Sequence, residues 1–207
     1  MTEAQARNYE ELSQFWCVPF TGQMLNFATL FGNENPLVIE IGFGMGQATS
    51  AIAAANPGVN YLGIEVYRNG IGRLLGDIRQ MGLTNLRIIE HDALEVLAAM
   101  IPDGAVEGFH LFFSDPWPKK KHHKRRLVQR PRTHLFSSKL RDQGYLSFVT
   151  DWEPYALFAR EELDATAGLV NQYESFAPPQ TWRPETKFEK KGRAGSRAIF
   201  ELLYRKK

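Results

Sequence analysis

The chain holds a single cysteine, Cys17, so it can form no internal disulfide and offers no cysteine cluster for a zinc site. It has no apolar run as long as a membrane span, and Met1-Thr2-Glu3 does not begin a signal peptide. The formal net charge is also small, at +2. These absences predict a cytoplasmic protein without a membrane segment, and 207 residues suffice for one α/β domain.

Positive charge is unevenly placed along this nearly neutral chain. Lys and Arg gather in residues 119–132, 183–197 and 205–207, whereas acids dominate other segments, notably 153–164. A basic footprint confined to a few segments favours an RNA or DNA partner over a membrane surface.

The first 36 residues differ in pattern from the rest of the chain. Their apolar positions at helical spacing are Tyr9, Leu12, Phe15 and Trp16. This spacing predicts a helix over 2–16 that docks through its apolar side, and a polar stretch ending in proline follows at 33–36. We therefore expect a cap helix and linker over 1–36 and a catalytic domain over 37–207.

From residue 37 onward, short apolar runs alternate with helical segments. The expected strands are 37–41, 60–66, 86–90, 106–114, 145–150 and 198–204. The expected helices lie at 47–55, between 66 and 81, at 93–100 and at 154–167. Repeated units of this length predict an α/β fold with a mainly parallel sheet and helices on both faces.

A glycine loop follows the first expected strand. Gly42, Gly44 and Gly46 have the spacing G-x-G-x-G, and Glu40 precedes them by two positions. Glycines let the backbone turn sharply and approach a ligand closely at a helix N-terminus. A pyrophosphate would be repelled by Glu40, which disfavours a nicotinamide dehydrogenase. A zwitterionic cofactor, whose amino group an acid can bind, fits better.

Two more acids follow the next two expected strands. Glu65 is placed to accept hydrogen bonds from two ribose hydroxyls, and Asp92 to accept one from an adenine amino group. Either acid alone is equally well explained as a helix N-cap. Together with Glu40 and the glycine loop, however, they predict a pocket for S-adenosylmethionine.

The most distinctive stretch joins an acid and an aromatic residue to a run of cations. We call residues 114–118 the Asp115 turn; there Asp115 precedes Pro116, and Trp117 lies between Pro116 and Pro118, after a predicted buried strand. We call residues 119–126 the basic segment, since it holds six Lys and Arg in eight positions. An acid and an aromatic can hold a base while cations neutralise phosphates. A solvated loop is the alternative. The adjacent histidines of the segment lack metal-ligand spacing, and we expect no metal site.

Seven short motifs resemble those of the bacterial tRNA (guanine-N7-)-methyltransferases, and the resemblance covers nearly all of the chain. They are EIGFGMG at 40–46, LGIEV at 62–66, HDA at 91–93, FFSDPW at 112–117, HKRR at 123–126, TDWEPY at 150–155 and TKFE at 186–189. The resemblance implies a Rossmann-like class I fold and transfer of a methyl group from S-adenosylmethionine to N7 of a tRNA guanine. The family's target is position 46, in the variable loop.

The resemblance also implies roles for individual residues. Cofactor-binding residues would be Glu40, Gly42, Gly44, Gly46, Glu65, Asp92 and Asp115, of which Asp115 would also be catalytic. Substrate- and RNA-binding residues would be Lys119, Lys121, His122, His123, Lys124, Arg125, Arg126, Asp151, Thr186, Lys187, Phe188 and Glu189. The partner would be tRNA, bound by a monomer or homodimer with no obligatory protein partner.

Guanine N7 keeps a lone pair in the neutral base, so the expected reaction needs no base catalyst. The protein must align the reactants and stabilise positive charge on the purine, a task for Asp115 that Asp151 and Glu189 are candidates to share. Two alternatives remain open. One is an RNA protein that binds the methyl donor without turnover. The other is an amino-group methyltransferase, which usually has a second proline in place of Trp117.

Overall fold

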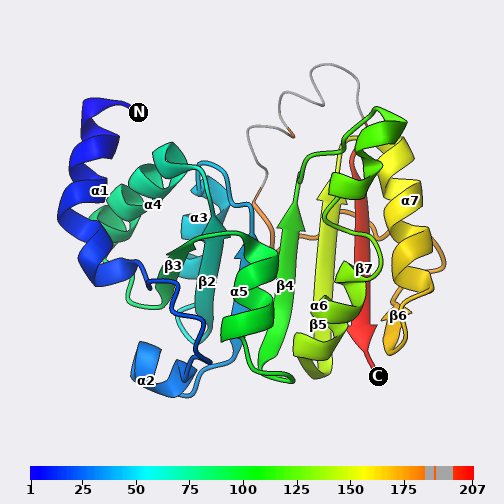
Figure 1. Ribbon diagram of the computed structural model, residues 1–207, viewed down its shortest axis with the longest axis horizontal. Coiled ribbons are helices and arrows are strands. Elements are labelled where there is room, and N and C mark those ends of the chain that lie inside the picture. Colours follow the sequence, from blue (N-terminus) through cyan, green and yellow to red (C-terminus); the bar gives the residue numbers. More distant parts are fainter. Residues whose placement is uncertain (185–188, 190–197) are drawn as a thin grey trace. The chain divides into compact units, whose positions relative to one another are not determined.

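A computed structural model describes residues 1–184, 189 and 198–207. The chain divides into two compact units (Figure 1). The first unit comprises Met1–Pro102 and Trp182–Pro184, and the second comprises Asp103–Thr181 and the described residues after Pro184. The boundary expected at residue 36 separates a cap helix and linker from a catalytic domain, which is a functional division. The two compact units do not test it, and it stays a prediction.

The first unit is built on three parallel strands in the order β3-β2-β1. Its elements are α1 (Glu3–Trp16), α2 (Phe27–Phe31), β1 (Leu37–Ile41), α3 (Gln47–Ala55), β2 (Asn60–Glu65), α4 (Arg68–Met81), β3 (Leu86–Glu90) and α5 (Ala93–Met100). Ile39 pairs in register with Leu62, and neither side chain is exposed. Strands buried on both faces explain the continuous apolar runs in the sequence.

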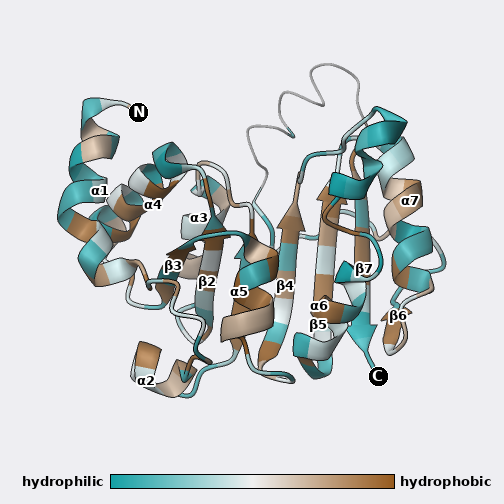
Figure 2. Ribbon diagram, in the orientation of Figure 1, coloured by the Kyte–Doolittle hydropathy of each residue, from teal (hydrophilic) through white to brown (hydrophobic). Residues whose placement is uncertain are grey.

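The second unit contains a mixed sheet in the order β4-β5-β7-β6. Its elements are β4 (Val106–Phe112), η1 (Lys120–Arg125), α6 (Arg132–Lys139), β5 (Leu140–Thr150), α7 (Glu153–Asp164), β6 (Leu169–Asn171) and β7 (Phe200–Lys206). Strands β4 and β5 are parallel, whereas β7 runs antiparallel to both β5 and β6. Figure 2 shows hydrophobic residues on β4 and β5. The short elements α2, η1, α6 and β6 were not expected from the sequence.

Helix α1 forms as predicted, and of its four expected docking residues Tyr9, Leu12 and Trp16 are half-buried. Phe15 is 67% exposed, so the prediction that it packs against the domain is wrong. Helix α4 also presents glycines to α1. A Cβ atom on Gly72 would lie 2.3 Å from the Gln5 carbonyl oxygen, and one on Gly76 would lie 2.4 Å from Asn8 Nδ2. The helices approach closely because these positions carry no side chain.

A polar contact fixes α1 to the end of β3. The Tyr9 hydroxyl donates to Glu90 Oε2, and Arg68 Nε donates to Glu90 Oε1 at 2.6 Å. The bond to this carboxylate, with some burial, raises the pKa of Tyr9 to about 12. The N-terminal helix is therefore anchored two residues before Asp92.

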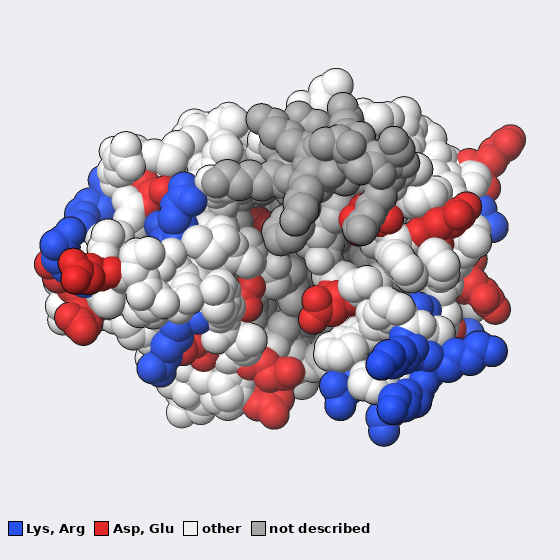
Figure 3. Space-filling model, turned by 90° about the horizontal axis from the view of Figure 1, so that it is seen from above, with Lys and Arg blue, Asp and Glu red and all other residues white. Residues whose placement is uncertain are grey.

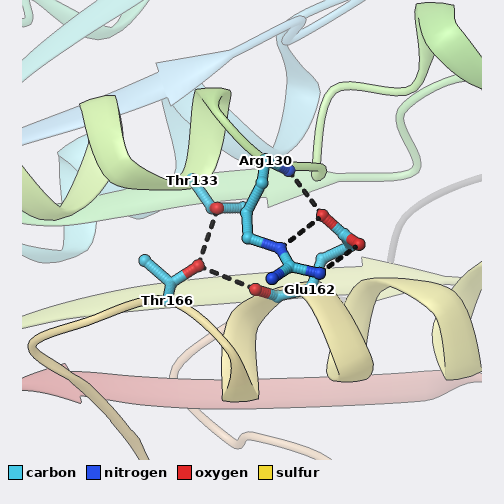
Figure 4. A network of polar contacts seen from close by, with 4 residues as sticks. All are labelled: Arg130, Thr133, Glu162 and Thr166. Atoms are coloured by element: carbon cyan, nitrogen blue, oxygen red, sulfur yellow. Dashed lines mark hydrogen bonds and ion pairs between the residues drawn. The ribbon is translucent and has the colours of Figure 1, made fainter.

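In the second unit, a polar network joins the start of α6 to the end of α7 (Figure 4). The Arg130 guanidinium donates to both carboxylate oxygens of Glu162 at 3.2 Å, and the Arg130 amide donates at 2.5 Å. The hydroxyls of Thr133 and Thr166 lie 2.7 Å apart, and Thr166 also bonds the Glu162 carbonyl. This network fixes the chain just beyond the basic segment. Across the described residues, no helix is both long and apolar enough to cross a membrane.

Candidate functional site

The glycine loop adopts a conformation that few other residues tolerate. Gly42, Gly44 and Gly46 have φ of 72°, 57° and 70°. A Cβ atom on Gly42 or Gly44 would meet nothing within 4 Å, so backbone conformation, and not lack of room, requires glycine there. Gly46 is the N-cap of α3 and contributes no side-chain cap. The amides of the first turn of α3 therefore have no capping side chain.

One further glycine, which the sequence did not reveal as part of the site, shapes this loop. Gly70, in the first turn of α4, lies so close to the loop that an added Cβ would sit 1.7 Å from the Gly44 carbonyl oxygen. No side chain fits in that space. The sequence signal is only that Gly70, Gly72 and Gly76 lie inside one helix, which does not reveal the contact.

Glu40 is a buried acid within β1, and only 4% of it is exposed. Its Oε2 atom has no hydrogen-bond partner among the residues that the structure describes. Burial raises the pKa of Glu40 to about 7, the neighbouring Glu65 charge adds to the shift, and the Thr49 hydroxyl opposes it. A buried carboxylate with an unsatisfied oxygen suits a ligand that brings a positive charge or a donor.

Glu65 ends β2 and already accepts three backbone hydrogen bonds. Gly44 N–H donates to Oε2 at 2.8 Å, and the amides of Val66 and Tyr67 donate to Oε1 at 2.7 and 3.0 Å. A carboxylate offers about four acceptor positions, so about one remains, on Oε2. Glu65 thus holds the glycine loop and keeps about one acceptor position free of the backbone.

Asp92 lies two residues beyond the end of β3 and is exposed. It is the N-cap of α5, and its Oδ1 accepts from the amides of Leu94 and Glu95 at 2.9 and 3.2 Å. The alternative role offered for Asp92 from the sequence, a helix N-cap, is therefore present in the structure. Its Oδ2 makes no hydrogen bond with the described part of the chain and can still accept one from a ligand.

In the second unit, the Asp115 turn follows β4, which ends at Phe112 rather than at the expected residue 114. Phe113 and Trp117 have φ of 53° and 44°, which is rare for bulky side chains and costs on the order of 1–3 kcal/mol each. Between them, Asp115 is exposed. Its carboxylate has no hydrogen-bond partner within the described ranges.

Arg126 secures one side of this turn. Only 2% of this residue is exposed, and its Nε donates to the Pro116 carbonyl at 2.9 Å. The guanidinium carbon lies 4.9 Å from the ring centre of Tyr155 and 4.7 Å from that of Phe158. Arg126 was expected in the RNA-binding surface, but the structure places it inside the second unit.

Tyr155 secures the other side of the turn. This residue of α7 is fully buried, and its hydroxyl lies 3.4 Å from Ser114 Oγ. It also accepts from the Val128 amide at 3.1 Å. The residues on both sides of Asp115 are thus tied to one buried aromatic and arginine cluster.

Most of the basic segment faces solvent. The exposed cations are Lys119, Lys120, Lys121, Lys124 and Arg125, whereas His122 and His123 are half-buried. Figure 3 shows blue side chains gathered at its lower right, where η1 lies. The Arg125 guanidinium carbon lies 4.9 Å from the centre of the Trp117 ring, and the centres of the His122 and Trp117 rings are 5.8 Å apart. Cations and an aromatic plane therefore lie beside Asp115.

Arg132 fixes the backbone of this segment. Its guanidinium donates to the carbonyls of Lys124 at 3.1 Å and Arg125 at 3.2 Å, and also to that of Arg126. These bonds satisfy carbonyls at the end of η1 and leave the Lys124 and Arg125 side chains exposed.

The structure gives the degree of burial of some of the other predicted site residues, and the rest lie outside the described range. Asp151 follows β5 and is half-exposed, and Glu189 is buried. Thr186, Lys187 and Phe188 lie outside the described residues. Open depressions of about 790 and 400 Å³ lie along α7 and between α1 and α4, and no predicted site residue lines either. Among the described residues, no group of three or more acids, histidines or cysteines could hold a metal ion.

Known proteins match the chain in sequence over most of its length. A family model described as "Putative methyltransferase" matches residues 34–202. The tRNA (guanine-N(7)-)-methyltransferase of Treponema pallidum (strain Nichols) is 47% identical, covering 99% of this chain and 91% of that protein. The protein of that name from Bordetella pertussis (strain Tohama I) is 43% identical, covering 100% of this chain and 81% of its own length.

Solved structures resemble the chain in fold at low sequence identity. The 16S rRNA methyltransferase KamB aligns with a TM-score of 0.64 at 14% identity, over 89% of this chain and 94% of its own. An rRNA methylase from Streptococcus thermophilus aligns with a TM-score of 0.56 at 10% identity, over 100% of this chain and 98% of its own.

The fold is therefore that of the Rossmann-like class I methyltransferases, as predicted. Within that class, the chain belongs to the family of the tRNA (guanine-N(7)-)-methyltransferases, which confirms the resemblance found in its motifs.

Proposed function

We propose that this chain transfers a methyl group from S-adenosylmethionine to N7 of a guanine in tRNA, and that the target is the variable-loop guanine at position 46. One observation supports this most strongly. The exposed carboxylate of Asp115 stands on a strained turn, beside an aromatic plane and a row of exposed cations. A base-binding acid and a phosphate-binding surface are thereby joined in one stretch of chain.

The first unit offers a cradle that fits the cofactor. S-adenosylmethionine, when bound, supplies an electrophilic methyl group on a sulfonium. Glu40 would hold the amino group through its unsatisfied Oε2, and the loop glycines would let the backbone approach closely. Glu65 has about one acceptor position left, enough for one ribose hydroxyl while Gly44 stays bound. Asp92 Oδ2 would accept from the adenine amino group.

The second unit supplies the groups that act on guanine. Asp115, when ionised, would accept from the guanine N1–H and amino group and hold N7 toward the methyl group. The same charge favours the cationic product, since positive charge grows on the purine as N7 attacks. We propose that Asp151 and Glu189 support this role. Contact of Asp115 with the cofactor stays a prediction.

The exposed cations of the basic segment would bind tRNA phosphates. Lys119, Lys121, Lys124 and Arg125 are exposed on a backbone that Arg132 holds in place. His122 and His123 would add polar contacts. Phosphate contacts of this kind position the RNA and are independent of its sequence.

Three further assignments concern the domain bounds, the compartment and the oligomeric state. We propose that residues 37–207 form the catalytic domain, with 1–36 as its cap helix and linker. We also propose that the protein acts in the cytoplasm, as a monomer or homodimer.

Methyl transfer to unmodified tRNA transcripts tests the proposal. The protein is incubated with S-adenosylmethionine labelled in its methyl group, and the digested RNA is separated into nucleosides. We expect N7-methylguanosine, and chain cleavage at the variable loop after borohydride and aniline treatment. A transcript with adenine at that position is the control. Label in an amino-methylated base would contradict the proposal, and cofactor binding without transfer would favour a binding protein.

A further inference from the structure

The Asp115 turn stores backbone strain that neighbouring contacts must hold. Phe113 and Trp117 have positive φ on either side of Asp115, and neither is glycine. Strained residues of this kind persist only where the surrounding structure fixes them, and they concentrate at functional sites. Side chains packed against the turn must therefore hold it.

The contacts point to Arg126 and its two aromatic neighbours. Its Nε donates to Pro116, the residue after Asp115, while its guanidinium lies over the Tyr155 and Phe158 rings. Both rings belong to α7, an element that runs from Glu153 to Asp164. Arg126 thus connects the turn to a helix of the same unit.

We infer that Arg126 is a positioning residue that holds the Asp115 carboxylate in its working place, and is not a phosphate contact. This inference rests on the proposed function. With 2% of its surface exposed, the guanidinium cannot meet a phosphate unless the cluster opens. The solvent-facing residues of the basic segment bind RNA, whereas its last residue holds the turn.

The chemistry of the site requires arginine in particular. A planar guanidinium stacks on aromatic rings while its edge donates hydrogen bonds in fixed directions. A lysine keeps the charge but loses this planar geometry. Arg126→Lys therefore separates charge from position, and its effect should differ in kind from the loss of a phosphate contact.

The test compares Arg126→Lys with Lys124→Gln, its exposed counterpart. For each we would measure the single-turnover rate at saturating tRNA and cofactor, tRNA affinity across a salt series, and cofactor affinity. We expect Arg126→Lys to lower the rate at least tenfold. Its tRNA affinity should stay within about twofold of wild type, with an unchanged salt slope. Lys124→Gln should flatten that slope by about 0.7–0.9, as expected for one lost phosphate contact.

A second variant keeps the inference testable if Arg126→Lys fails to fold. Tyr155→Phe retains the ring beside Arg126 but removes the hydroxyl that contacts Ser114 and Val128. We expect a smaller loss of rate, again with unchanged tRNA affinity and salt slope, and with cofactor affinity retained as evidence of folding.

Two results would overturn the inference. One is a wild-type saturated rate in a folded Arg126→Lys, because a phosphate contact needs only the charge that lysine keeps. The other is a wild-type rate in Tyr155→Phe when Arg126→Lys is unfolded. Failure of the proposed function looks different, because the wild-type protein itself would then transfer no methyl group to guanine N7.

Discussion

The glycine loop in the first unit and the Asp115 turn in the second reach their geometry by different means. The glycine loop adopts positive φ without strain, since each of its positive-φ residues is a glycine, and acids supply its polar groups. The Asp115 turn places Phe113 and Trp117 at positive φ, and a buried arginine cluster holds it. The first region suits a ligand that brings hydrogen-bond donors, and the second suits a base within a nucleic-acid chain, whose phosphates the neighbouring cations can bind.

Substitution of Asp115 should have the largest effect and should separate the two regions. Asp115→Ala removes the only acid of the turn, and we expect methyl transfer to fall on the order of 100-fold, as for loss of one group that stabilises developing charge. Cofactor affinity, measured by calorimetry, should stay within about twofold of wild type. A parallel collapse of cofactor binding would assign Asp115 to the cofactor site instead.

Glu65→Ala should affect the first region. It removes three backbone hydrogen bonds, including the one to Gly44, together with a ribose contact. Loss of a charge-assisted bond costs about 1.5–3 kcal/mol, so cofactor affinity should fall roughly 10- to 100-fold. The rate at saturating cofactor should change much less. Unchanged affinity would remove Glu65 from the pocket.

Gly70→Ala tests the contact that the sequence did not reveal. The added methyl group would push on the Gly44 carbonyl, so we expect cofactor affinity to fall by about tenfold and tRNA affinity to stay as in wild type. Gly58→Ala is a matched control, since a Cβ there meets nothing within 4 Å. Equal cofactor affinity in both variants would show that the loop position is not set by α4.

The raised pKa of Glu40, about 7, predicts a pH dependence in cofactor binding. Below that pH the neutral acid must lose a proton before it can pair with an amino group. Affinity in the wild type should therefore rise as pH increases toward about 7, by up to about tenfold per unit, and Glu40→Gln should abolish the rise. Titration calorimetry at several pH values measures it, and parallel pH profiles would contradict the assignment.

The same shift carries a stability effect of opposite sign in the ligand-free protein. The unfolded carboxyl loses its proton near its ordinary value of 4.5, whereas the folded one keeps it to about 7. Glu40 therefore lowers the free energy of unfolding as pH rises through that window, and the loss levels off above it. Denaturant unfolding of wild type and Glu40→Gln at both ends of the window would reveal the difference.

The smallest effect should come from the exposed cations. Replacing Lys121 and Lys124 by alanine should flatten the dependence of log affinity on log salt by roughly 1.4–1.8. Each phosphate contact that is lost reduces the number of counterions released when the tRNA binds. Filter binding of a tRNA transcript across a salt series measures the slope. Equal slopes for the wild type and the double variant would show that the basic segment is a solvated loop.

The sequence revealed the glycine loop because backbone with positive φ favours glycine. It revealed the acids Glu65 and Asp92 because each stands at or just after the end of an apolar run that reads as a strand. It did not reveal Gly70, since the need for glycine there comes from Gly44, far away in the chain. Helical spacing predicted α1 but not that Phe15 would stay exposed. In a run of cations, no local pattern distinguishes buried Arg126 from its exposed neighbours, because the rings that cover it lie on α7.

Transfer to guanine N7 can be tested with a modified substrate. A tRNA with 7-deazaguanine at the variable-loop position has a C–H group in place of N7 and keeps the N1–H and amino group that Asp115 would bind. We predict that this tRNA binds with an affinity close to that of the ordinary transcript and accepts no methyl group. Methyl transfer to the 7-deaza transcript at a rate comparable to the ordinary one would contradict it.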